Sequence, residues 1–140
     1  MGARALAVLC WLYLVGCGTD SPPEAPTLQL PFTSNVDSRV LVNNIQGVSV
    51  GTSVGFAFGA LNAGNQSLVV QTVTYVGDTE MVLQAFGPPP VATLSFNDEL
   101  IIGLTCTPPA VATYAGTVFI VSNAVNTPDA TVFLSCVGMP

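Results

Sequence analysis

The side chains that could do chemistry in this 140-residue chain are four cysteines and eight acidic residues, and there is no histidine. A catalytic nucleophile needs a neighbouring base, for which histidine is the usual choice, and the only basic residues here are Arg4 and Arg39. We therefore expect neither an enzyme nor a bound cofactor. Two cations in a chain of formal net charge −6 also exclude recognition of a nucleic-acid backbone.

Carboxylate pairs are the remaining candidates for acid–base chemistry or metal binding. Asp78 and Glu80 would share one face of a strand, whereas the adjacent Asp98 and Glu99 would point to opposite faces. Glycosidases use such pairs, and Ca²⁺ prefers oxygen ligands. Because both pairs lie beside turn residues and match no EF-hand spacing, we expect solvated loop charges and no metal. The alternative function is a calcium- or glycan-binding surface module that uses these acidic loops.

The first residues have the pattern of an export signal. Arg4 gives a short positive start, and residues 5–15 are all apolar. That run is too short for a membrane-spanning helix, which needs about 20 residues. The pattern predicts that residues 1–16 are a signal peptide.

The apolar run ends in Leu14-Val15-Gly16-Cys17. This resembles the lipobox of bacterial lipoproteins, in which the cysteine becomes the first residue of the mature protein. The resemblance implies that Cys17 carries a diacylglycerol thioether and an N-linked acyl chain, which place the protein on a membrane of the bacterial cell envelope. Gly18 stands where lipoproteins of the inner membrane often have Asp, which favours the outer membrane. An ordinary secretory signal, with Cys17 a free or paired thiol, is the alternative.

The lipobox resemblance also limits the disulfide pairing. Cys10 belongs to the predicted signal peptide, so if Cys17 is acylated, Cys106 and Cys136 form the only pair available in an oxidising compartment. The chain between them gives a loop-entropy estimate of about 3.5 kcal/mol of stabilisation. A zinc site is the competing interpretation, but two cysteines without histidine do not complete one.

The elements that must position these residues are strands. Residues 17–31 begin with Cys17, which the lipobox resemblance implies is lipidated, and continue with several prolines and no apolar periodicity, which predicts a disordered spacer. Residues 32–140 show no helical pattern, and short apolar runs alternate with Gly, Asn and Pro. The clearest runs cover residues 53–61, 67–76, 81–86, 100–106, 114–122 and 130–137. We predict an all-β domain, an immunoglobulin-like β-sandwich of about seven antiparallel strands.

Short motifs spread over residues 40–138 carry a second resemblance. They are Val48-Ser49-Val50-Gly51-Thr52, Leu61-Asn62-Ala63-Gly64-Asn65, Leu68-Val69-Val70, Thr107-Pro108, Tyr114-Ala115-Gly116-Thr117 and Ile120-Val121-Ser122-Asn123. This set is similar to domains of the ASH (ASPM–SPD-2–Hydin) or choice-of-anchor D type, which are immunoglobulin-like. Departures are Ile45-Gln46-Gly47 in place of an aromatic–glycine pair, and the two cysteines Cys106 and Cys136. The resemblance implies a non-catalytic interaction or scaffolding module, and it transfers no shared ligand and no functional residues. Together with the lipobox, it leads us to expect an envelope protein as the partner.

Overall fold

The computed structural model describes residues 21–31 and 40–140, the second range with side chains from residue 47 onward. The predicted signal peptide, the lipobox with Cys17 and both arginines lie outside these residues. No helix long and apolar enough to cross a membrane occurs in the two described ranges. The strands are β1 (Leu28–Gln29), β2 (Val40–Ser49), β3 (Val54–Asn62), β4 (Leu68–Gly77), β5 (Met81–Leu83), β6 (Ala92–Leu94), β7 (Glu99–Cys106), β8 (Thr113–Ser122) and β9 (Asp129–Met139).

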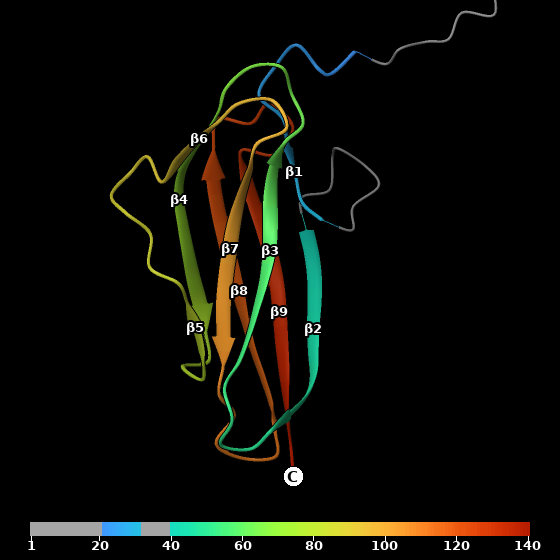
Figure 1. Ribbon diagram of the computed structural model, residues 1–140, viewed down its shortest axis with the longest axis vertical. Coiled ribbons are helices and arrows are strands. Elements are labelled where there is room, and N and C mark those ends of the chain that lie inside the picture. The colour runs from blue at the N-terminus through green and yellow to red at the C-terminus, as the bar shows by residue number, and fades with distance from the viewer. Residues whose placement is uncertain (1–20, 32–39) are drawn as a thin grey trace, which may run out of the picture.

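These strands form two facing sheets (Figure 1). One sheet has the order β1-β3-β7-β5 and the other the order β2-β9-β8-β4-β6. The predicted all-β, immunoglobulin-like sandwich is confirmed. The described residues contain nine strands rather than about seven, because β1 and β6 are too short to show an alternating pattern in the sequence. The pairing is also not all antiparallel, since β2 runs parallel to β9.

The alternating runs predicted from the sequence bury one face of each long strand between the sheets. The largest fully buried side chains include Leu30, Leu68, Met81, Ile102 and Ile120, which come from both sheets and from the N-terminal segment. Burial of each such side chain contributes roughly 1.5–3 kcal/mol, so this layer is the main stabilising element of the fold.

The predicted disulfide is present. Cys106 at the end of β7 and Cys136 in β9 are bonded, with an S–S distance of 2.01 Å and a Cα–Cα distance of 6.6 Å. Both cysteines are fully buried. Because β7 and β9 belong to different sheets, the bond joins the two layers of the sandwich directly.

Residues 22–30 form what we call the N-terminal strap, which crosses one end of the sandwich (blue in Figure 1). The Asn65 N–H donates to the Pro23 carbonyl oxygen (N···O 3.0 Å), and the Val125 N–H donates to the Pro26 carbonyl oxygen (3.0 Å). Thr27 and Leu28 are buried, and Leu28 begins strand β1. The prediction of a disordered spacer up to residue 31 is therefore wrong for this part, because docking onto the loops supplies partners that the Pro-rich sequence lacks by itself.

Asn62, at the end of β3, holds the same end of the sandwich together. It is fully buried, and its Nδ2 donates to the carbonyl oxygens of Gln66 (2.8 Å) and Leu94 (3.0 Å). Its Oδ1 accepts from the Gly64 N–H (3.0 Å) and from the Thr27 N–H (3.5 Å). One side chain thus connects the strap, the β3–β4 turn and strand β6.

Candidate interaction site

Strand β4 is covered by different amounts on its two sides. On one side it pairs with β8 from Val70 to Gly77, with a register shift between Val70 and Thr72. On the other side β6 pairs only with Leu68, Val69 and Val70. Among the described residues, no strand therefore pairs with residues 72–77 on that side, and we call this stretch the open edge of β4 (Figure 1).

The backbone groups that face the open edge follow from the register. The Asp78 N–H donates to the Ala115 carbonyl oxygen (3.0 Å), which places Asp78, at the end of β4, on the β8 side. Backbone groups alternate in direction along a strand, so Thr74 and Thr72 also face β8. The N–H and C=O groups of Val73 and Tyr75 consequently point toward the open edge, where an added strand could bond to them.

A groove lies beside this edge, between β4 and the loop of residues 84–91. It has a volume of about 490 Å³ and is lined mainly by apolar side chains, among them Val73, Leu83, Phe86 and Val91. The loop contains Pro88, Pro89 and Pro90, which have no N–H to donate to β4. Before this loop the chain pairs with β7 of the other sheet through β5, and it reaches the edge of β4 only at β6.

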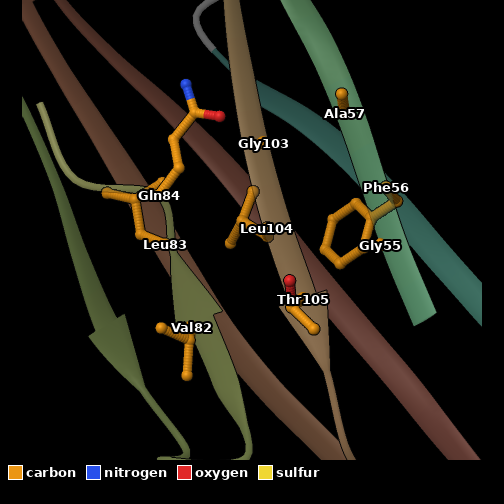
Figure 2. A pocket seen from close by; sticks show the side chains of 9 residues that line it. All are labelled: Gly55, Phe56, Ala57, Val82, Leu83, Gln84, Gly103, Leu104 and Thr105. Carbon is orange, nitrogen blue, oxygen red and sulfur yellow. The ribbon is translucent and has the colours of Figure 1, made fainter. Parts of the chain in front are cut away.

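A second hollow lies on the outer face of the four-stranded sheet, across β3, β7 and the end of β5 (Figure 2). It is a shallow depression of about 470 Å³ whose floor is made of small residues, including Gly55, Ala57 and Gly103. Gln84 forms part of its rim, and its Nε2 donates to the Ile101 carbonyl oxygen (2.9 Å). Because Leu83 and Gln84 line both hollows, the depression and the groove meet at this residue pair.

Tyr75 is the one ionisable residue that lines either hollow. Its ring packs against the core and its hydroxyl donates to the Asp78 carbonyl oxygen (3.0 Å). Burial, and then the charges of Asp78 and Glu80, raise the pKa of Tyr75 above its ordinary value. Neither hollow has a nucleophile beside a base among its lining residues, and both linings are mainly apolar.

The structure keeps the two acidic pairs apart from each other. Asp78 and Glu80 lie in the β4–β5 turn, whereas Asp98 and Glu99 lie at the start of β7, near the opposite end of the sandwich (Figure 1). The Asp78 carboxylate accepts from the Ala115 N–H (2.7 Å) and the Asp98 carboxylate from the Ser95 N–H (2.8 Å). Within residues 21–31 and 40–140, no group of three or more His, Cys, Asp or Glu could hold a metal ion.

The open edge and its groove were not predicted from the sequence. The available signal is the run Gly87-Pro88-Pro89-Pro90, which indicates the end of a strand. The proline run shows that pairing stops. It does not show that the neighbouring strand is β4, because that depends on the pairing of residues far apart in the chain.

Comparison with known proteins locates the fold. No protein-family model and no curated protein matches the sequence. A protein of unknown function from Porphyromonas gingivalis W83 has a similar structure, with a TM-score of 0.59 and 13% identity over 84% of this chain and 49% of that one. The chain thus spans about half the length of that protein.

Two further structures are similar. The ASH/PapD-like domain 7 of human CEP192 matches with a TM-score of 0.58 and 10% identity over 99% of this chain and 96% of that domain. The VesB protease of Vibrio cholerae matches with a TM-score of 0.57 and 14% identity over 69% of this chain and 30% of the protease. At these identities the likeness shows the fold alone. The chain has an immunoglobulin-like β-sandwich of the kind found in ASH/PapD-like domains.

Proposed function

We propose that this protein is a lipid-anchored protein of the bacterial cell envelope whose domain binds an extended segment of a partner protein. The anchor is Cys17 of the lipobox Leu14-Val15-Gly16-Cys17. The binding element is the open edge of β4, to which the segment adds as a further strand. Such strand addition uses main-chain hydrogen bonds for affinity and alternate side-chain pockets for specificity.

The observation that carries this proposal is the coincidence of an uncovered strand edge with a groove. The open edge offers the backbone groups of Val73 and Tyr75 at the correct spacing for a strand. The groove beside it receives alternate side chains of the added segment against Leu83 and Phe86. A soluble sheet that leaves an edge of this kind uncovered exposes itself to pairing with other chains, so such edges are usually protected.

The groove and its surroundings favour a segment of particular chemistry. Its lining is mainly apolar, which suits Val, Ile, Leu or Phe at alternate positions. At the Gly77 end of the edge lie Asp78 and Glu80, and the whole chain has no lysine. A Lys or Arg that follows the apolar positions would therefore meet complementary charge at that end.

Two Ala→Trp substitutions test the site against the other hollow. Ala85 lines the groove and Ala57 lines the depression, and both are exposed. A photo-crosslinking amino acid at Ala85 in the intact lipoprotein identifies the partner segment in its own envelope, and a synthetic peptide of that segment is then titrated. We expect Ala85→Trp to weaken peptide binding by at least about tenfold and Ala57→Trp to leave it nearly unchanged. Loss with Ala57→Trp alone would move the site to the depression.

Hydrogen exchange of the peptide complex tests the binding mode. Strand addition protects the amides of Val73 and Tyr75, whereas the amide of Thr74 is already bonded to β8. A complex in which the peptide leaves both open-edge amides unprotected would show that binding does not use strand addition. Calorimetry with Ca²⁺ alone checks the alternative function, and no binding heat is expected.

The lipid anchor is tested separately. Globomycin or Cys17→Ala should leave an unprocessed or soluble form, and mass spectrometry of the wild-type protein should show acylation of Cys17. Normal retention on the membrane with Cys17→Ala would contradict the anchor.

A further inference from the structure

The strap fixes the place where the chain enters the fold. The Asn65 N–H bonds to the Pro23 carbonyl oxygen, and the Gln66 Nε2 donates to the Glu24 carbonyl oxygen (3.0 Å). Hydrogen bonding between the strap and the folded domain therefore begins at Pro23. We call this end of the sandwich the N-terminal pole; it comprises the strap, the turn of residues 95–98 and the loop of residues 123–128.

The chain between the lipidation position and this pole is short. Pro23 is the sixth residue after Cys17, which gives a greatest reach of about 20 Å. Strands β4 and β8 have 10 residues each, so the sandwich is about 34 Å long without its loops. A lipid on Cys17 can reach the membrane beside the N-terminal pole far more readily than beyond the opposite end.

Two large apolar side chains are exposed at the N-terminal pole. Phe96 is 45% exposed on the turn before β7, and Val125 is 67% exposed on the β8–β9 loop. Both loops are tied to the centre of the pole, because the Asn97 N–H donates to the Asn62 carbonyl oxygen (2.9 Å) and the Val125 N–H donates to the strap. The two side chains are thus presented from fixed loops on the same end from which the strap leaves.

The turn that presents Phe96 is tightly constrained. The Asp98 N–H donates to the Ser95 carbonyl oxygen (3.0 Å), and the Asp98 carboxylate accepts from the Ser95 N–H. Asn97 has a φ of 65°, in the left-handed region that few residues other than glycine adopt. The turn therefore fixes the backbone that carries the partly exposed Phe96 ring.

We infer, building on the lipid anchor proposed above, that the N-terminal pole lies against the membrane and that Phe96 and Val125 enter its interfacial region. The acidic residues at this end are Glu24 and Asp98 in the pole itself, Glu99 where β7 begins and Asp129 where β9 begins, and the described part of the chain has no Lys or Arg. Contact is consequently apolar and favours an uncharged lipid surface over an anionic one.

The chain offers a clean way to test this orientation. Its only tryptophan, Trp11, precedes Cys17, and in the chain from Cys17 onward Cys17 is the only thiol outside the disulfide. That chain can therefore be coupled through Cys17 to a maleimide lipid in phosphatidylcholine vesicles. Phe96→Trp then places a single fluorophore on the pole, and Val125→Trp is a second reporter from the other loop.

The matched control is Val111→Trp, in the β7–β8 loop at the opposite end of the sandwich, where Val111 is 64% exposed. With brominated lipids we expect strong quenching of Phe96→Trp and Val125→Trp, and none of Val111→Trp. Equal quenching of all three, or quenching of Val111→Trp alone, would overturn the inference. So would the absence of quenching at both pole positions.

Failure of the anchor is distinguishable from failure of the orientation. Coupling through Cys17 is chemical, so the vesicle experiment reports the orientation whether or not cells acylate Cys17. The mass of the cellular protein reports acylation independently. An unmodified Cys17 in cells would overturn the orientation as a cellular property together with the anchor, whereas acylation without pole quenching would overturn the orientation alone.

Discussion

The two lateral sides of the sandwich end in different ways. On one side β2 covers β9 from Val40, opposite Thr131, to Ser49, opposite Met139, whereas in the other sheet β1 covers only Leu61 and Asn62 of β3. On the other side β6 and β5 have three residues each, and residues 72–77 of β4 stay uncovered. In the five-stranded sheet the β2 side is the closed side, because a chain segment returns along β9, and the β4 side is the open side, beside a proline-rich loop. A sheet can accept a further strand only along an edge that its own chain leaves free.

The largest effect is expected from the Cys106–Cys136 disulfide, which joins the two sheets. Cys106→Ala together with Cys136→Ala should lower the free energy of unfolding by about 3.5 kcal/mol, because the unfolded chain gains the freedom of an open loop. Urea unfolding of the oxidised protein and of the double variant measures this difference. An unchanged midpoint would mean that the sheets do not depend on this link.

The next effect comes from Asn62, whose side chain connects the strap and the β3–β4 turn to strand β6. Asn62→Ala should cost about 2–3 kcal/mol, because it leaves buried backbone groups of Gly64 and Leu94 without partners. Hydrogen exchange should show the strap and β6 losing protection together. Asn65→Ala, an exposed change in the same turn, is the control and should stay within about 0.5 kcal/mol. Loss of protection in only one of the two segments would show that Asn62 does not couple them.

A third prediction compares the two edges directly, without a substitution. Amides of β4 should alternate, with Val73 and Tyr75 exchanging about tenfold or more faster than Thr72 and Thr74. Strand β9 has a partner on both sides, so its amides should show no such alternation. Equal protection of neighbouring amides along residues 72–75 would mean that the edge of β4 is covered in solution.

The smallest effect is a pH dependence at the open side. Burial, and then Asp78 and Glu80, raise the pKa of Tyr75 above its ordinary value of 10.0, so the folded state favours the neutral phenol. Its contribution to stability is complete below about pH 10 and is lost as the pH rises through the raised folded value. The free energy of unfolding should therefore fall less steeply between pH 9 and 12 in Tyr75→Phe than in the wild type. Identical slopes would remove Tyr75 as a source of the alkaline destabilisation.

The sequence predicted the parts of the fold that depend on local pattern. Alternation located β3, β4, β7, β8 and β9 to within about two residues, because each has one face in the core. The cysteine count predicted the bond between Cys106 and Cys136. The two acidic pairs lie near opposite ends of the sandwich, and Asp78 and Asp98 also bond to backbone N–H groups, which their positions beside turns did not reveal.

The parts that depend on long-range docking could not be predicted. Thr27 and Leu28 sit among prolines with no periodicity, yet they are buried because the β3–β4 turn and Asn126 bind their backbone groups. The open edge likewise follows from the pairing of β4 with both β6 and β8, which no local pattern specifies. Pro-rich composition alone cannot distinguish a spacer from a segment that packs on a folded surface.

The disulfide also determines how the domain would respond to mechanical load. A pulling force between an N-terminal anchor and a partner on β4 would first act on the strap and on the two residue pairs of β1 with β3. The covalent loop from Cys106 to Cys136 encloses β8, the strand that supports β4, and withholds about 100 Å of contour length from extension. Under such a load the protein would lengthen at its N-terminal end. Strand β8, which supports the partner-binding strand β4, would stay inside the covalent loop closed by the disulfide.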